Sequence, residues 1–396
     1  MRLTGLRTFV VGNPPPSFGG RYFVFLVLET DAGVTGVGEV YAATFHPTVI
    51  ERGIEDVFER HVLGTDPFRI ETLYRTVAMR GYSGRPDLTL EGVLSGIEMA
   101  CWDIVGKAVG KPVHELLGGR VHERLRTYTY LYTEPGDAAD VYLDPELAAE
   151  RAAEYAARGF TALKFDPLGP YSAFDPRQPS LEALVRTQDY VGRIRDAVGD
   201  RCDLLVGTHG QLTPAGAIRL AQRLERFDPL WLEEPVPPDS PEQMATVARA
   251  TSIPVATGER LTTKHEFARL LQTGAAAILQ PNLGRVGGLL EAKKIAGMAE
   301  AYYAQIAPHL YCGPVVGAAN IQLAACSPNF LVLEGILDWG GFHAELLTTP
   351  IRWEEGYVLV PDAPGLGVEL DEAVAAAYPY DGAELHLSAH DAPVVE

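Results

Sequence analysis

The chain has few cysteines, few positive charges and no long apolar run. Its cysteines, Cys101, Cys202, Cys312 and Cys326, are scattered singly with no CxxC spacing, so neither a disulfide framework nor a zinc site is indicated. With 33 Lys and Arg against 52 Asp and Glu, the formal net charge is −19. That charge argues against nucleic acid or an anionic membrane as a partner. An anionic substrate would therefore need a local positive site.

No apolar segment is long enough to span a membrane, and residues 1–20 are broken by Gly and Pro before any sustained apolar stretch. We therefore expect a soluble, unprocessed enzyme in the reducing cytoplasm. A length of 396 residues suits a barrel plus a smaller cap, and an apolar fraction of 47% is ample for a large core.

The pattern along the chain divides it into three parts. Alternating apolar residues near the N-terminus predict an antiparallel meander, and helical patterns follow from 47 to 118, so residues 1–123 are interpreted as an α+β cap. Short apolar runs then alternate with helices over 124–352, which predicts a barrel. Residues 353–396 begin as a hairpin and turn that we expect to return to the cap.

Eight apolar runs are the candidate barrel strands, with amphipathic helices between them: RTYTYLY, TALKFD, DLLVG, PLWLE, PVATGE, AAILQ, AQIAPH and NFLVLEG. Two helix starts are explicit. Thr213 with Pro214, and Ser240 with Pro241, each supply an N-cap residue followed by a first-turn proline.

Three segments, LLVGTHG, WLEEP and ATGER, place Gly207, Glu233 and Glu259 at an even spacing of 26 residues, each directly after an apolar run. A (β/α)₈ barrel uses roughly 25 to 30 residues per unit and gathers its catalytic groups at the carboxyl ends of the strands. Residues one unit apart become neighbours there, and two carboxylates facing one mouth suit a hard cation such as Mg²⁺. The first position, however, is glycine.

Longer motifs carry a resemblance to a known family: IEMACWDIVGKAVGKPVHELLGG, TALKFDP, WLEEP, ATGER, QPNLGRVGG, APH and PDAPGLGVEL. Over nearly its full length the chain resembles the enolase superfamily, in the mandelate racemase and muconate lactonizing branch. KFDP and THG look most like the acid-sugar dehydratases related to galactonate dehydratase. The resemblance implies a modified (β/α)₈ TIM barrel with an α+β capping domain, dependence on Mg²⁺, and a homo-oligomer, a dimer or an octamer.

The chemistry that the resemblance implies starts with abstraction of the proton α to a carboxylate. The resulting enediolate needs a divalent metal to stabilise its second negative charge. Glu233 and Glu259 match two metal ligands, whereas the third, an aspartate in most relatives, falls on Gly207. Water, His209 or the substrate's own oxygens are the candidates for the vacant position.

Lys164, at the end of the second strand, is a candidate base if nearby positive charge lowers its pKa. The alternative is an electrostatic partner of the enolate. Asp166 points to the same side, because strand side chains alternate. It would contact substrate, orient Lys164 or pair with a cap residue.

Two histidines and one glutamate complete the candidate machinery. His309 matches the family's base or acid, but its usual aspartate partner falls on Asn282, whose amide can accept from one imidazole nitrogen without stabilising imidazolium. His209 matches a histidine that delivers a proton to the departing β-hydroxyl; a buried hydrogen-bonding role or metal ligation are the alternatives. Glu334 matches a glutamate that binds the substrate carboxylate or stabilises the intermediate.

Specificity is expected from two mobile cap loops, near NPPPSFGGRYF and YAATFHP. Glycines beside a proline run suit a lid with a hinge and a rigid arm. Arg21, Tyr41 and His46 are the candidate substrate contacts in these loops.

The leading hypothesis is a Mg²⁺-dependent hydro-lyase that converts a sugar acid into a 2-keto-3-deoxy acid. A cycloisomerase or racemase on the same scaffold is the nearest alternative, since the fold does not separate these reactions. A sugar-acid-binding protein with impaired catalysis is a third hypothesis, because Gly207 and Asn282 both replace aspartates. The identity and stereochemistry of the sugar stay open.

Overall fold

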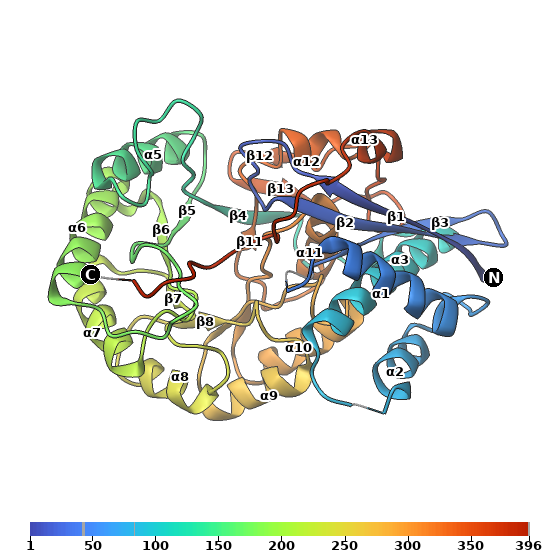
Figure 1. Cartoon of the computed structure of the whole chain (residues 1–396), viewed down its shortest axis with the longest axis horizontal. Helices are drawn as coiled ribbons and strands as arrows, with labels where there is room; N and C mark the ends of the chain where they lie inside the picture. Colours follow the sequence, from blue (N-terminus) through green and yellow to red (C-terminus); the bar gives the residue numbers. More distant parts are fainter. Residues whose placement is uncertain (42–43, 83, 395–396) are drawn as a thin grey trace.

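The computed structural model describes residues 1–41, 44–82 and 84–394. A cap, at the right of Figure 1, leans against a barrel at the left. The cap sheet is antiparallel, in the order β1 (Leu3–Gly12), β2 (Tyr22–Thr30), β3 (Thr35–Val40), as the meander pattern predicts. Its helical elements follow in the order α1 (Pro47–Val57), η1 (Phe58–Val62), α2 (Ile70–Arg80), α3 (Leu88–Val109) and α4 (Val113–Leu116).

Eight parallel strands form the barrel, one at each predicted run: β4 (Arg124–Tyr130), β5 (Ala162–Phe165), β6 (Asp203–Gly207), β7 (Trp231–Glu233), β8 (Val255–Thr257), β9 (Ile278–Leu279), β10 (Gln305–Ile306) and β11 (Leu333–Glu334). They are hydrogen-bonded in sequence order, and β11 closes the ring by pairing with β4. The outer helices are α5 (Pro145–Ala157), α6 (Leu181–Val198), α7 (Pro214–Leu224), α8 (Pro241–Ala248), α9 (Lys264–Thr273), α10 (Leu289–Ala301) and α11 (Pro314–Ala325). The fold is the expected capped (β/α)₈-type barrel.

The two explicit helix starts differ in outcome. Thr213 caps α7 by accepting a hydrogen bond from the backbone N–H of Gly216 at 3.2 Å. Ser240 stands at the cap position of α8 but makes no side-chain capping bond. Its hydroxyl faces the carboxylate of Glu242 at 3.5 Å instead. The predicted helix start, with Ser240 at the N-cap position and Pro241 in the first turn, is confirmed, but the serine side chain does not cap the helix.

A layer of packed side chains fills the floor of the barrel. One inward-facing residue from or directly beside each strand builds it: Tyr128, Ala162, Leu205, Trp231, Ala256, Ile278, Ala307 and Val332. Because strand side chains alternate, the residues two positions further on face the same interior at the carboxyl ends. This upper layer is where the candidate chemistry lies.

The C-terminal segment contributes to both parts. The hairpin of β12 (Trp353–Glu354) and β13 (Tyr357–Leu359) forms as expected, but β13 pairs with β4 and so extends the barrel sheet. The chain reaches the cap only afterwards, where the backbone N–H of Gly12 on β1 donates to the carbonyl of Tyr378 just after α13 (Glu372–Ala377). The tail then crosses the barrel mouth (Figure 1).

Two buried cap glutamates hold the cap on the barrel. Glu39 on β3 accepts hydrogen bonds from backbone N–H groups at the start of α11, and Glu98 on α3 does the same at the start of α10. The first N–H groups of a helix have no partner within the helix and carry the positive end of its dipole. Both carboxylates therefore satisfy barrel groups that docking of the cap would otherwise bury unpaired.

Candidate active site

The upper layer of the barrel gathers most of the residues that the sequence singles out. Two positions beyond the packed floor stand Tyr130, Lys164, Gly207, Glu233, Gly258, Gln280, His309 and Glu334. Glu259 follows Gly258, and Asp166 lies just after β5. Side chains from seven of the eight strands, or from the loops directly after them, therefore gather at the carboxyl end of the barrel.

Lys164 is fully buried among carboxylates. Its ammonium contacts Glu233 and lies 3.5 Å from Glu334 Oε1. Burial opposes the charge on Lys164, but these carboxylates outweigh it and raise its pKa above the ordinary lysine value. In this arrangement Lys164 is a cation, which is the reverse of the lowered pKa that a base needs.

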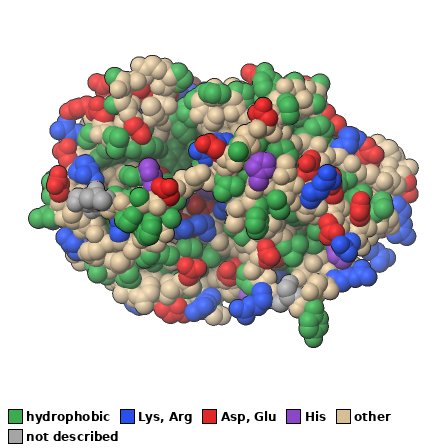
Figure 2. Space-filling view, viewed as in Figure 1, with side chains coloured by type: hydrophobic (Ala, Val, Ile, Leu, Met, Phe, Trp, Pro, Cys, Tyr) green, Lys and Arg blue, Asp and Glu red, His purple; other side chains and the backbone are tan. Residues whose placement is uncertain are grey.

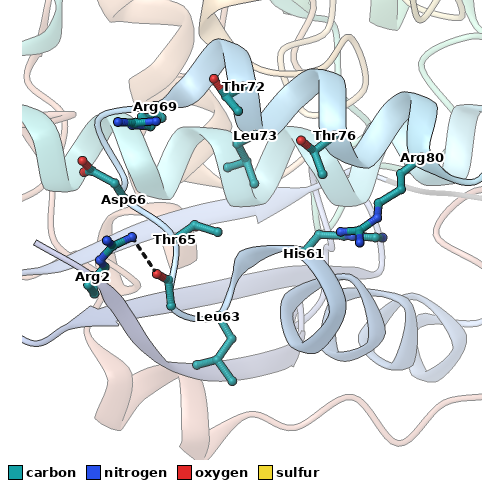
Figure 3. Close-up of a pocket in the computed structure, with 11 residues that line it drawn as sticks. Arg2, His61, Leu63, Thr65, Asp66, Arg69, Thr72, Leu73, Thr76 and Arg80 are labelled. Atoms are coloured by element: carbon teal, nitrogen blue, oxygen red, sulfur yellow. Dashed lines mark hydrogen bonds between the residues drawn. The ribbon is translucent and has the colours of Figure 1, made fainter.

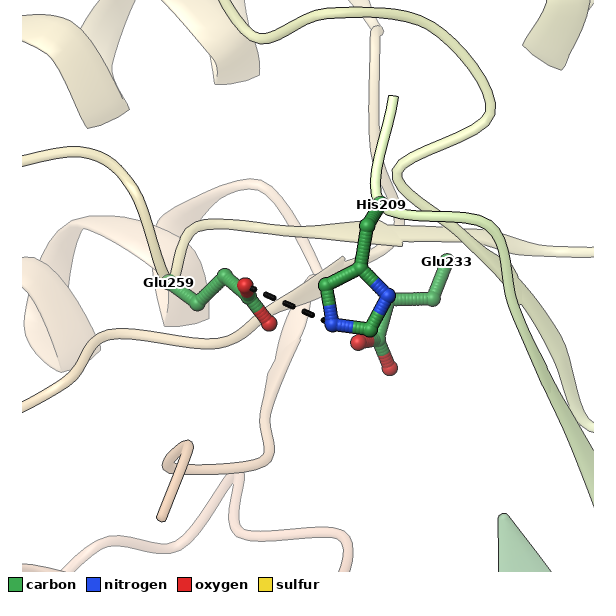
Figure 4. Close-up of side chains that lie close together, drawn as sticks. All are labelled: His209, Glu233 and Glu259. Carbon is green, nitrogen blue, oxygen red and sulfur yellow. Dashed lines mark ion pairs between the residues drawn. The ribbon is translucent and has the colours of Figure 1, made fainter. Parts of the chain in front are cut away.

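A divalent cation fits the donor atoms of His209, Glu233 and Glu259 (Figure 4). Each offers one ligand atom, and these atoms lie within 4.8 Å of one another. The Glu259 side chain is 7% exposed, and its Oε2 has no hydrogen-bond partner among the described residues. Burial raises the pKa of Glu233 to about 7. These are the properties of carboxylates that a bound cation would stabilise.

With Asp166 in its present position, Gly207 has no room for a side chain. A Cβ atom at this position would lie 1.9 Å from Asp166 Oδ1. The carboxylate of Asp166 thus occupies the space where a residue 207 side chain would begin, and that oxygen has no hydrogen-bond partner among the described residues.

The position of the His209 side chain is fixed by its own loop and by the hydroxyl of Tyr171. It adopts φ 41°, and Glu234 in the next loop adopts φ 42°; both angles are costly for residues other than glycine. The Thr208 hydroxyl anchors this turn to the carbonyls of Glu233 and Glu234, at 2.9 and 2.8 Å. The hydroxyl of Tyr171 contacts His209 Nδ1 at 2.6 Å and donates to Asp166 Oδ2. Burial opposes a charge on His209, yet Asp166 and Glu259 raise its pKa.

The hydrogen bond between Asn282 and His309 runs in the opposite direction from the one expected. Its Oδ1 accepts from the backbone N–H of Gly284 at 2.8 Å, which leaves its NH₂ group facing His309 Nδ1 at 2.8 Å. The amide therefore donates, and the expectation that it accepts from the imidazole is wrong. Nδ1 must be unprotonated, so neutral His309 carries its proton on Nε2, 3.4 Å from Glu259 Oε2. Burial lowers the pKa of His309.

A cavity of about 340 Å³ opens above these groups and has a tyrosine-rich wall. In the space-filling view, the hollow between barrel and cap is bordered by hydrophobic side chains (Figure 2). Asp166, His209, Glu259 and His309 reach into it. Its remaining lining consists of Tyr41, Tyr130, Tyr132, Tyr142, Tyr171, Tyr311 and the tail residues Leu387, Ser388 and Ala389.

Comparison with known proteins identifies the family to which this architecture belongs. Residues 16–118 match the mandelate racemase / muconate lactonizing enzyme N-terminal domain, and residues 147–374 match the family described as enolase C-terminal domain-like. The chain belongs to the mandelate racemase/muconate lactonizing enzyme family.

Curated relatives and solved structures agree with this membership. D-galactonate dehydratase of Ralstonia nicotianae is 37% identical over 94% of this chain and 93% of the relative. D-xylonate dehydratase of Haloferax volcanii is 33% identical over 96% and 89%. The mandelate racemase/muconate lactonizing enzyme structure from Sulfitobacter sp is 53% identical, covers 100% of both chains and superposes with a TM-score of 0.97.

Of the three predicted cap contacts, only Tyr41 reaches the cavity of this family member. It stacks on His309 with ring centroids 6.1 Å apart. Arg21 pairs with Glu384 at 2.7 Å, and the two ring nitrogens of His46 contact Thr48 and the carbonyl of Gly382. Residues 42–43 of the second predicted lid loop lie outside the described residues.

A second cavity, of about 430 Å³, lies in the cap (Figure 3). Arg2, Arg69 and Arg80 line it together with His61 and Asp66. It contains none of the strand-end residues of the barrel, four of which (Tyr130, Asp166, Glu259 and His309) line the tyrosine-rich cavity.

Sequence reasoning missed the tail, Gln280 and five tyrosines of the cavity, Tyr130, Tyr132, Tyr142, Tyr171 and Tyr311. Gln280 donates to Glu233 Oε2 at 2.7 Å, and strand alternation from Ile278 could have identified it. Tyr171 lies in an irregular loop, where no period marks an inward side chain. The ring nitrogens of His386 in the tail contact the carbonyls of Tyr22 and Tyr311 at 2.9 Å each, and the backbone of His390 pairs with that of Ser172. These contacts join distant segments and have no local signal.

Proposed function

We propose that this enzyme is a Mg²⁺-dependent dehydratase of a sugar acid, which releases a 2-keto-3-deoxy acid. The observation that carries the proposal is the position of Lys164 and His309 around the two glutamates that would hold the cation. Lys164 contacts Glu233, and His309 Nε2 lies 3.4 Å from Glu259. The identity to D-galactonate and D-xylonate dehydratases supports the same reaction class.

The charges of the site explain why a carboxylate substrate would require the cation. Glu233 and Glu334 contact the buried Lys164, and the carboxylates of Asp166 and Glu259 lie 3.6 and 3.8 Å from ring nitrogens of His209. A substrate carboxylate entering this set would be repelled, since like charges in a poorly solvated site interact strongly. A divalent cation bound to Glu233 and Glu259 would reverse that repulsion and stabilise the enediolate.

Lys164 and His309 divide the proton transfers between them. Lys164 is positioned to take the proton α to the carboxylate. A cation held by Glu233 and Glu259 would offset the negative charges that raise the Lys164 pKa. His309 delivers its Nε2 proton to the β-hydroxyl as the carbon–oxygen bond breaks, so hydroxide leaves as water. The enol that results tautomerises to the 2-keto acid. Asn282 suits this role because it keeps the His309 proton on Nε2.

The tyrosine wall suits the rest of a sugar acid. Tyrosine offers an apolar face and a hydroxyl that donates and accepts. The Tyr132 hydroxyl is buried and makes no hydrogen bond within the described part of the chain, so it is free to bind a substrate hydroxyl.

A screen of the purified protein with Mg²⁺ against a library of sugar acids, including D-galactonate and D-xylonate, tests the proposal. Trapping with semicarbazide detects the 2-keto product. We expect turnover of at least one sugar acid, and its loss in Glu233→Gln. Epimerised or lactonised product without a keto acid would support the racemase or cycloisomerase instead, and saturable binding without product would support a binding protein.

We also propose that the enzyme is a cytoplasmic homo-oligomer, a dimer or an octamer. All four cysteines are buried free thiols, which suits a reducing compartment. Within the described residues, no helix has the length and apolarity to cross a membrane. Light scattering on the purified protein, and fractionation of the cells, test the two points.

A further inference from the structure

We infer that His209 Nε2 is the third protein ligand of the cation, and that Tyr171 and Asp166 are positioning residues that hold its lone pair toward the metal. The inference rests on the proposed cation site. The ligand set of this chain is then two glutamates and one histidine, in place of three carboxylates. The carboxylate of Asp166 takes the space of the missing residue 207 side chain, but it acts on the ligand His209 through Tyr171 and does not bind the metal.

The direction of the hydrogen bonds fixes the His209 tautomer. Asp166, as a carboxylate, can only accept, so the single hydroxyl proton of Tyr171 points to Asp166 Oδ2. The phenol oxygen must then accept from His209 Nδ1–H, at 2.6 Å. A neutral imidazole protonated on Nδ1 has a bare Nε2. Metal-bound histidines are commonly oriented in this way by a partner on the second nitrogen.

The bare Nε2 faces oxygen atoms that also lack a proton. It lies 3.8 Å from Glu259 Oε1, too far for a hydrogen bond. Nε2, Glu233 and Glu259 enclose one point, as their ligand atoms lie within 4.8 Å of one another (Figure 4). A cation at that point would be within reach of all three side chains. The competing explanation is that His209 is protonated on both ring nitrogens, in which case its Nε2–H would interact with Glu259 alone.

The glycine at 207 makes the arrangement sterically possible. A side chain there would require the Asp166 carboxylate to move from its contact with Tyr171, because the Cβ would lie 1.9 Å from Asp166 Oδ1. The αL conformation of His209, at φ 41°, is the cost of turning the imidazole inward from the loop. The Thr208 and Gly210 bonds to the next loop hold it there.

Pulsed EPR of Mn²⁺ bound to the full-length protein tests the inference without substrate or turnover. Electron spin echo modulation from a directly bound imidazole ¹⁴N is expected in the native protein and should vanish in His209→Asn. Mn²⁺ bound to the native protein without ¹⁴N coupling would overturn the inference, and would leave Asp166 Oδ1 or water as the third ligand.

Mn²⁺ titration of the positioning residues is the second arm. Tyr171→Phe removes only the hydroxyl and should weaken Mn²⁺ binding about 10-fold or more. The matched control is Tyr132→Phe, which removes an unpartnered hydroxyl from the same cavity and should leave Mn²⁺ affinity unchanged. Equal effects of the two substitutions would contradict a positioning role for Tyr171.

A ligand exchange completes the test. Gly207→Asp alone should weaken Mn²⁺ binding because of the collision with Asp166, whereas Gly207→Asp combined with Asp166→Ala should restore affinity in the His209→Asn background. Thermal unfolding of each variant confirms that it folds. Native Mn²⁺ binding with ¹⁴N coupling but no turnover of any sugar acid would refute the proposed function and leave this inference standing.

Discussion

Asn282→Asp should reverse the tautomer of His309. In the native protein the Asn282 NH₂ group donates to His309 Nδ1 at 2.8 Å, because the Gly284 N–H occupies the amide oxygen. Placing the imidazole proton on Nδ1 would set two donors against each other in a buried site. An unsatisfied buried donor costs about 1–3 kcal/mol. At 1.36 kcal/mol per tenfold, the Nε2–H tautomer is favoured by roughly 5- to 150-fold.

An aspartate at 282 has almost the same shape but can only accept. It should therefore draw the proton to Nδ1 and leave Nε2 bare, or stabilise the doubly protonated ring. Two-dimensional ¹H–¹⁵N spectra of the Mg²⁺-loaded protein report which ring nitrogen carries the proton. His309→Gln assigns the signal among the ten histidines. A proton on Nδ1 in the native protein, or no change in Asn282→Asp, would refute this account of His309.

Further predictions concern the cap, the tail and the effect of acid. Burial lowers the pKa of His343 from 6.5 to about 4, so folding favours the neutral imidazole. The stability that the neutral His343 contributes is lost as pH falls from 6.5 through 4. From this residue we expect about 2 kcal/mol less stability at pH 5 than at pH 7. Denaturant titrations should show this difference and its loss in His343→Gln. His386→Ala removes the two contacts that hold the tail beside Tyr22 and Tyr311, so KM should rise roughly 5- to 30-fold, and unchanged steady-state kinetics would contradict a role for His386 in holding the tail at the cavity. Glu98→Ala leaves N–H groups at the start of α10 unpaired and should cost on the order of 3 kcal/mol, measured by thermal unfolding, whereas Glu300→Ala, at an exposed position near the other end of α10, should have little effect.

The arrangement of the barrel follows from regularities that are visible along the chain. The 26-residue spacing of Gly207, Glu233 and Glu259 reflects one strand, helix and return loop per unit. Strand alternation then places Lys164, Glu233, His309 and Glu334 in one layer. Residues on regular strands are therefore the part of the site that a sequence can predict.

What sequence reasoning missed depends on contacts between segments far apart in the chain. The Asn282 side chain could face His309 with either end, and only the position of the Gly284 N–H decides between them. Tyr171 acts from an irregular loop, and Arg21 is drawn away from the cavity by Glu384 in the tail. No local periodicity encodes these orientations, because each depends on a partner that only the folded chain supplies.

The most direct test of the central claim is a reaction in D₂O with Mg²⁺ and a sugar acid that the screen selects, followed by NMR. Dehydration through an enediolate predicts a 2-keto-3-deoxy acid carrying one solvent deuterium at C3, since the enol takes up its proton there. Deuterium at C2 of recovered or epimerised substrate, with no keto acid, would contradict the dehydratase and point to a racemase.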